Sequence, residues 1–117
     1  MVGVKMARPV KQDLYCYRGQ TFNQNFYFTQ SEEPLSLGGM TAKAQIRPTE
    51  NSKTLTAEFE CAIFAEEGKL NLYLSSDVTS EIKSGNYVWD LKITNSARNV
   101  VDYWIAGKFV VSGRVTE

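Results

Sequence analysis

The chain has 117 residues, 43% of them hydrophobic, and its 13 basic and 13 acidic residues leave no formal net charge. This length supports one hydrophobic core but not two, so a single domain is expected. A neutral chain lacks the basic surplus that duplex-binding proteins use to neutralise phosphates, and no apolar run approaches the roughly 20 residues of a membrane span. Neither nucleic acid nor a membrane is therefore an expected partner.

Six stretches of the chain alternate apolar and polar residues with period two, and each is closed by Gly, Pro, Asn or Ser. Successive side chains of a strand point to opposite faces, so each stretch places an apolar row on one side. The pattern predicts an all-β fold, an immunoglobulin-like antiparallel β-sandwich of about seven strands with one short helical turn. The expected core consists of Phe22, Phe26, Phe28, Ile46, Phe59, Leu70, Leu72, Tyr87, Trp89, Leu91, Ile93, Tyr103 and Phe109.

In chain order, residues 1–13 show no alternation and are expected to form a flexible N-terminal arm. Residues 14–117 then make up the single sandwich domain. Its strands are expected at residues 14–17, 22–29, 41–47, 54–64, 69–74, 86–94 and 100–111.

Residues 75–85 are the one segment where a helix is expected, with Ser76 or Asp77 as the cap and with Val78 and Ile82 on one face. Gly85-Asn86-Tyr87 then enters a strand at the place of the tyrosine corner of immunoglobulin-like domains. The tyrosine hydroxyl either bonds back to the preceding connection or belongs to an ordinary core tyrosine, and the sequence leaves both interpretations open.

The residues offer little catalytic chemistry. No histidine is present, so the commonest metal ligand and the usual general base near neutral pH are missing. Cys16 and Cys61 are expected to be reduced and buried, with a disulfide across the sheets as the alternative. The carboxylate pairs Glu32-Glu33 and Glu66-Glu67 lie in turns, where adjacent side chains point apart. The sequence therefore predicts no enzyme, no cofactor and no metal site.

Most aromatic residues fall in the inward rows, but Trp104 falls by parity in the outward row of the last strand. Together with valines, an exposed tryptophan forms the kind of apolar patch that marks interfaces. The alternative is that a loop or the N-terminal arm covers it. The predicted interface residues are Trp104, Val88, Val110, Tyr73 and Val100, and the residues leave open whether the partner is a second copy, another protein or a sugar.

Five segments form an ordered series: R-G-Q-T-F (18–22), L-S-L-G-G-M-T-A-K-A-Q-I-R (35–47), G-K-L-N-L-Y-L (68–74), T-S-E-I-K-S-G-N-Y (79–87) and W-D-L-K-I (89–93). The series resembles the small β-sandwich domains encoded among phage and prophage tail genes, such as the N-terminal domain of siphophage baseplate upper proteins. Those domains typically show R-G-D-T-F near the start and T-x-x-L-x-x-G-x-Y ahead of a late strand. The chain departs from the pattern at Gln20, where the family has Asp, and in its L-G-G segment, where the family has a threonine.

The resemblance implies a virion structural or assembly protein of a tail, baseplate or head–tail joint. Such a module docks to other tail or baseplate proteins or to copies of itself, and it is found in the host cytoplasm during assembly and then in the virion. The alternative function is a carbohydrate-binding module that uses Trp104, Tyr73 and Tyr103 as stacking platforms.

Overall fold

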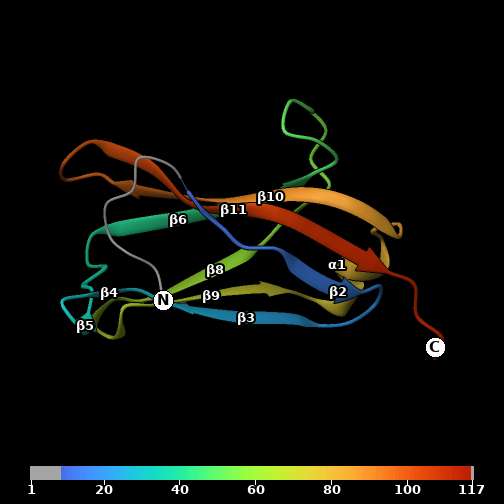
Figure 1. Cartoon of the computed structure of the whole chain (residues 1–117), viewed down its shortest axis with the longest axis horizontal. Helices are drawn as coiled ribbons and strands as arrows, with labels where there is room; N and C mark the ends of the chain where they lie inside the picture. Colours follow the sequence, from blue (N-terminus) through green and yellow to red (C-terminus); the bar gives the residue numbers. More distant parts are fainter. Residues whose placement is uncertain (1–8, 117) are drawn as a thin grey trace.

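The computed structural model of the chain describes residues 9–116, which form two layers of β-sheet with a short helix at one end (Figure 1). The larger sheet has the strand order β1-β11-β10-β6-β7, and β2 also pairs with β11. The smaller sheet has the order β3-β9-β8, and β4 and β5 form a separate hairpin. The predicted all-β class is confirmed. The elements are β1 (Val10–Lys11), β2 (Leu14–Tyr17), β3 (Phe22–Tyr27), β4 (Thr29–Gln30), β5 (Glu33–Pro34), β6 (Met40–Arg47), β7 (Ala57–Glu58), β8 (Glu60–Phe64), η1 (Ala65–Glu67), β9 (Lys69–Leu74), α1 (Ser76–Ser80), β10 (Gly85–Asn95) and β11 (Val100–Ser112).

The expected strand 54–64 is interrupted, because the chain changes sheets within it. β7 pairs with β6 in the larger sheet, whereas β8 pairs with β9 in the smaller one. Phe59 lies at the crossing, where its N–H donates to the Ala44 carbonyl at 2.9 Å and its ring is buried. Residues 54–56 lie outside the strands, and Leu55 is 44% exposed although it belongs to the apolar row of this stretch.

The expected helix is present as α1, but its cap and its inward residue differ from the prediction. Ser75 is the cap, and its hydroxyl accepts from the Val78 N–H. Val78 is exposed, whereas Thr79 is buried and donates its hydroxyl proton to the Gln20 carbonyl at 2.8 Å. The helix therefore closes the end of the sandwich through a buried hydrogen bond as well as through the buried Ile82.

Tyr87 forms the hydrogen bond of a tyrosine corner. Its hydroxyl donates to the Lys83 carbonyl at 2.6 Å, while its ring packs against the buried core. Of the two interpretations of this tyrosine, the bonded one is correct. The bond joins the start of β10 to the connection that follows α1.

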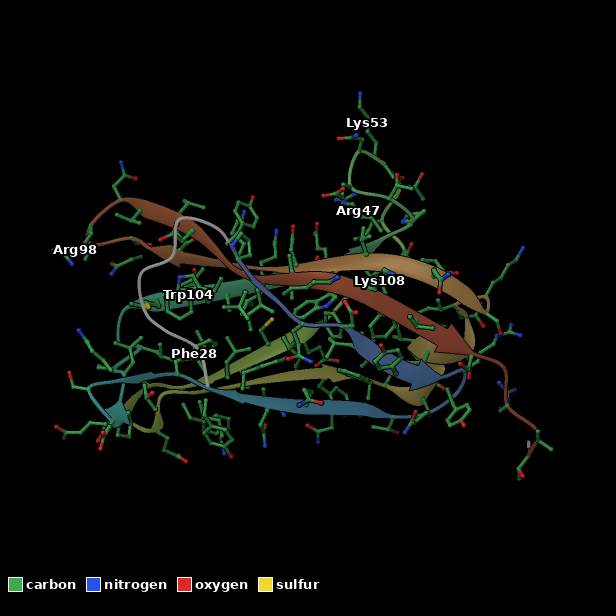
Figure 2. The ribbon with its side chains drawn as sticks, viewed as in Figure 1. Phe28, Arg47, Lys53, Arg98, Trp104 and Lys108 are labelled. Atoms are coloured by element: carbon green, nitrogen blue, oxygen red, sulfur yellow. The ribbon has the colours of Figure 1, made fainter. Side chains whose placement is uncertain are left out.

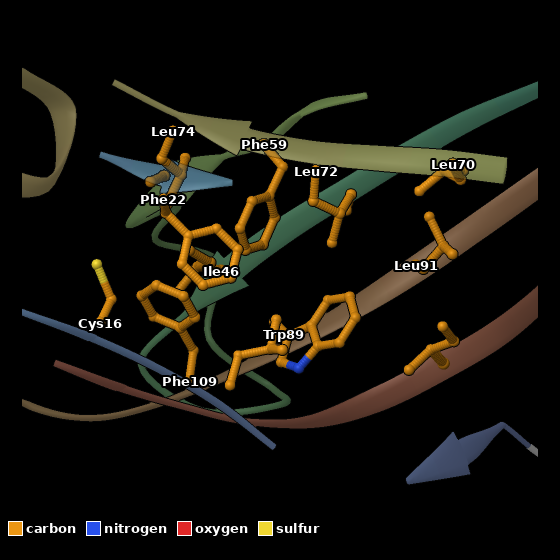
Figure 3. Close-up of a cluster of buried hydrophobic side chains, with 14 of the residues drawn as sticks. Cys16, Phe22, Ile46, Phe59, Leu70, Leu72, Leu74, Trp89, Leu91 and Phe109 are labelled. Carbon is orange, nitrogen blue, oxygen red and sulfur yellow. The ribbon is translucent and has the colours of Figure 1, made fainter. Parts of the chain in front are cut away.

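The core lies between the two sheets and is rich in aromatic rings (Figure 3). Phe59 is at its centre, with ring centroids 5.6 Å from Phe22, 5.8 Å from Trp89 and 5.7 Å from Phe109. Edge-to-face and tilted arrangements at such distances add to the gain from burial. The predicted core is confirmed except at Tyr103, since its other members are buried or pack against the buried cluster.

A β-bulge in β11 corrects two sequence predictions. Leu91 lies opposite Ile105 and Lys92 lies opposite Tyr103, so Trp104 is the extra residue of the bulge. Trp104 is only 9% exposed, with its ring centroid 4.9 Å from that of Phe28. The extra residue reverses the inward and outward alternation of β11 for the residues before 104, so the Tyr103 side chain is 47% exposed. The predicted outward Trp104 and inward Tyr103 are therefore both wrong.

The N-terminal segment completes the larger sheet. β1 and β2 both run parallel to β11 in one register, with Val10 opposite Ile105 and Leu14 opposite Phe109. Residues 10–13 are thus part of the sandwich rather than of the predicted arm, and residues 1–8 of that arm lie outside the described residues. Between β1 and β2 the chain passes close over Gly107, where an added Cβ would lie 2.2 Å from the Gln12 carbonyl oxygen.

Trp104 and its neighbour Tyr103 provide a direct test of the bulge. We expect Trp104→Ala to lower the free energy of unfolding by about 3–5 kcal/mol, as truncations of large buried rings do. Tyr103→Ala removes an exposed ring and is expected to cost less than about 1 kcal/mol. Urea denaturation followed by circular dichroism measures both values, and equal losses would contradict the bulge.

Gly107 provides a second test, because only a residue without a Cβ fits beneath Gln12. We expect Gly107→Ala to destabilise the fold by about 1–3 kcal/mol, the cost of overpacking a close contact. Gly38→Ala is the control, because its Cβ would meet nothing nearer than the Ser36 hydroxyl at 3.6 Å. Thermal unfolding of the two variants compares them, and a Gly107→Ala chain as stable as the control would refute the close approach.

Candidate functional site

The five predicted interface residues do not form one surface. Trp104 is in the core, while Val88 and Val110 lie on the outer face of the larger sheet, alternating with the buried residues of β10 and β11. Tyr73 lies on the outer face of the smaller sheet, between Asn23 and Glu60 in the strand register. Val100 is exposed where β11 begins. Only Val88 and Val110 are brought together, on neighbouring strands.

The outer face of the larger sheet contains an open groove of about 680 Å³. Its walls come from β1, β6, β10, β11 and the loop that follows β6. In Figure 2, Arg47 stands on this face below the loop that carries Lys53. The groove is lined by the charged residues Lys11, Lys43, Arg47, Glu50, Asp90 and Lys92, and by Pro9, Gln45, Thr49, Val88, Trp89, Tyr103, Ala106 and Gly107.

Two lysines of the groove face each other directly. Lys92 of β10 is the register partner of Lys43 of β6, and both side chains line the groove. Side chains directly opposite on one face of a sheet lie about 5 Å apart at Cβ, and like charges there are destabilising. Among residues 9–116, neither Lys43 nor Lys11 forms a salt bridge or a hydrogen bond through its side chain. The groove thus concentrates positive charge that the fold does not neutralise.

Arg47 is held in place at one end of the groove. Its Nη2 donates to Gln45 Oε1 at 2.9 Å, and its Nη1 donates to the Ser52 carbonyl at 3.5 Å. Gln45 in turn donates from Nε2 to Glu58 Oε1 at 3.1 Å. The Gln45 amide therefore lies between the Glu58 carboxylate and the Arg47 guanidinium. The N–H groups of Arg47 that make neither of its two hydrogen bonds are available for a ligand.

Asp90 lies within this positive region and is half-buried. Burial raises the pKa of its carboxyl group above the ordinary value of 3.8, while the charges of Arg47 and Lys92 oppose the rise. Desolvation outweighs the attraction of the two cations. With Glu50, Asp90 sets two carboxylates against the four cations of the groove, which leaves an excess of positive charge.

Two tyrosines extend the site and were not among the predicted residues. Tyr15 and Tyr17 of β2 are 69% and 60% exposed. Tyr15 is the register partner of Val110, and Tyr17 is the partner of Ser112. The sequence does indicate their exposure, because the apolar Leu14 and Cys16 alternate with them and, when buried, direct the two tyrosines outward.

The remaining reactive groups are scattered. Cys16 is buried and Cys61 is half-buried, and both are free thiols, so the predicted reduced state is correct. Burial raises the pKa of both thiols, that of Cys61 to about 11.

Within residues 9–116, no three acidic or cysteine side chains are grouped as metal ligands. In the same part of the chain, no helix has the length and apolar character needed to cross a membrane.

The chain matches no family model and no curated protein. The residues themselves define the site as an open groove with excess positive charge, apolar walls and neighbouring exposed tyrosines.

Asp90 makes stability depend on pH with a definite sign. Because its folded pKa is raised, the native chain loses stability as pH rises from 3.8 through the folded value, and the loss persists at neutral pH. We expect Asp90→Asn to raise the melting temperature at about pH 7 and to change it little at about pH 3. Melting curves at both pH values measure this, with Asp102→Asn, an exposed carboxylate of β11, as the control. A variant that is less stable than the wild type at neutral pH would contradict the burial penalty.

Proposed function

We propose that the chain is a structural or assembly protein of a bacteriophage or prophage virion, acting as a protein–protein interaction module of a tail, baseplate or head–tail joint. The single observation that carries this proposal is the outer face of the larger sheet. It combines an open groove, an arginine held by hydrogen bonds, half-buried valines and two exposed tyrosines. Tyrosine and arginine are enriched at protein interfaces, where they supply much of the binding energy.

The motifs of the tail-domain resemblance support the proposal through the positions they take in the fold. Arg18 donates from Nε to the Ser80 carbonyl at 3.0 Å, which connects R-G-Q-T-F to α1. Gly68, which opens G-K-L-N-L-Y-L, has a left-handed φ of 61°, and an added Cβ there would lie 2.5 Å from the Phe28 carbonyl oxygen. Tyr87 of the G-N-Y motif makes the hydrogen bond to Lys83. These three motif residues, Arg18, Gly68 and Tyr87, therefore join or closely approach other elements of the sandwich.

We further propose that the sandwich is immunoglobulin-like. The strand order β3-β9-β8 against β11-β10-β6-β7 supports this, because a variable-type immunoglobulin sandwich has strands B-E-D against G-F-C-C′. The tyrosine hydrogen bond before β10, the strand equivalent to F, supports the same assignment. In this assignment the groove lies on the outer face of the sheet that contains strands G, F and C.

The alternative function, carbohydrate binding, is not favoured. Its three stacking aromatics are separated, because Trp104 is buried, Tyr103 lines the groove, and Tyr73 lies on the opposite outer face. No single platform contains them.

Incorporation into particles tests the proposed function. We expect a strain in which the gene is deleted to release incomplete particles, and wild-type protein supplied in trans to be recovered in purified virions. Val88→Asp, on the groove face, is expected to prevent incorporation, while Tyr73→Asp, a half-buried position on the opposite face, is expected to allow it. Quantitative mass spectrometry of purified particles measures both, after melting curves have shown that both variants fold.

Complete, infectious particles from the deletion strain that contain none of this protein would refute the virion role. Equal incorporation of both variants would show that the outer face of the larger sheet is not the interface. A glycan array provides the comparison with the alternative, since specific sugar binding by the folded chain would favour that function instead.

A further inference from the structure

The chain carries an acidic surface at the end of the molecule formed by the β4–β5 hairpin (Figure 1). Glu32 and Glu33 are exposed at the hairpin, and Glu66 and Glu67 are exposed on η1. Hydrogen bonds join the residues that flank the hairpin to η1 and the residue after it, since the Phe28 N–H donates to the Gly68 carbonyl and the Leu37 N–H donates to the Ala65 carbonyl. We name these four glutamates the acidic end.

The tip of the hairpin is held in an unusual backbone conformation. Ser31 has a φ of 52° and Glu32 a φ of 65°, so two consecutive residues with side chains occupy the left-handed region. A two-residue turn of this kind matches the twist of a hairpin, but it favours Asn-Gly or Gly-Gly. A glutamate at such a position is strained, and strained residues cluster at functional surfaces. The turn presents Glu32 and Glu33 on a short, hydrogen-bonded hairpin.

The groove carries the complementary charge. Its four cations and two carboxylates leave an excess of two positive charges, although the whole chain has none. Lys43 and Lys92 face each other, and among residues 9–116 neither forms a salt bridge, although the charge of Lys92 acts on Asp90. A carboxylate placed beside these lysines relieves this repulsion.

The apolar features also correspond. Pro34 follows Glu33 and is exposed at the hairpin. The groove offers Tyr103, Val88 and Ala106 beside its lysines. An acidic turn followed by a proline therefore matches a groove that has lysines and apolar walls next to each other.

We propose that the groove binds the acidic end of a second copy of this chain, in a head-to-tail contact. The hairpin of one protomer, which carries Glu32 and Glu33, enters the groove of the next and meets Lys43 and Lys92. The two surfaces are different patches of the same molecule, so the contact is heterologous and builds a ring or a filament rather than a closed pair. This inference rests on the proposed assembly function and names the partner of its interaction surface.

Self-association of the full-length chain tests the inference. Sedimentation equilibrium at about 0.02 M and about 0.5 M salt compares conditions in which the screening length falls from roughly 20 Å to roughly 4 Å. We expect oligomers at low salt and a dissociation constant at least about tenfold higher at high salt. Lys43→Ala with Lys92→Ala, and separately Glu32→Gln with Glu33→Gln, are each expected to abolish the oligomers.

Mixing these two double variants gives the sharpest result. Each retains one working surface, so an equimolar mixture is expected to form a one-to-one complex and nothing larger. Exchanging the charges within one chain, with Lys43→Glu, Lys92→Glu, Glu32→Lys and Glu33→Lys, is expected to restore the oligomers. No general change in net charge explains such a restoration, because the exchanged chain has the wild-type total.

Two matched controls remove the same charges elsewhere. Lys53→Ala with Lys83→Ala, and Glu60→Gln with Glu81→Gln, change exposed side chains outside both surfaces, and both are expected to associate like the wild type. A wild-type chain that is monomeric at low salt would overturn the inference, as would controls that dissociate equally or a mixture without a complex. If the monomeric chain is still incorporated into particles, the proposed function stands and only the identity of the partner changes.

Discussion

The crossing of the N-terminal segment over Gly107 is the constraint on which the rest of the sandwich depends. The indole N–H of Trp89 donates to the Gln12 carbonyl at 2.9 Å, and Trp89 and Gly107 are register partners in β10 and β11. A buried indole N–H without an acceptor is costly, so a large aromatic core residue at this position requires a nearby carbonyl. Gly107 provides the space through which the Gln12 carbonyl reaches it.

The same crossing positions parts of the outer face of the larger sheet. The Gln12 N–H donates to the Ala106 carbonyl, and the Lys108 N–H donates to Asp13 Oδ1, so both sides of Gly107 are tied to the N-terminal segment. β1 before the crossing supplies Lys11 to the groove, and β2 after it supplies the exposed Tyr15. One contact inside the core therefore determines where two parts of the outer surface lie.

Alternation predicted much of the fold because each strand buries one face, and a face follows parity within an uninterrupted strand. β6, β9 and β10 agree with the prediction for this reason. The bulge at Trp104 has no signature in alternation, since a single inserted residue leaves apolar residues at both 104 and 105. The alternation pattern therefore predicts Tyr103 inward and Trp104 outward, the reverse of what the structure shows. The interface predicted around Trp104 is for this reason centred on a core residue. The alternation pattern also does not reveal the interruption at Phe59, because a chain that passes from one sheet to the other keeps its apolar row.

The site could be predicted only in part. Parity places Lys43 and Arg47 in one outward row and Asp90 and Lys92 in another. That Lys43 and Lys92 meet depends on β6 pairing with β10, a contact between segments about 50 residues apart in sequence that local pattern does not encode. The acidic end needs the same long-range information, because Gly68 and Phe28 bring η1 against the hairpin.

The zero net charge of the chain gains a different meaning once these positions are known. A total of zero makes nucleic acid an unexpected partner but leaves local segregation of charge possible, and here it conceals positive charge in a groove and negative charge at an end. Because the total charge is zero, copies do not repel one another overall, whereas in the proposed contact the acidic end of one copy attracts the groove of the next. The rotation between successive copies then decides whether such a contact closes into a ring or continues as a filament. In the proposed contact this rotation is set by how the hairpin enters the groove, so we expect the turn at Ser31 and Glu32 to control both the geometry and the affinity of the assembly.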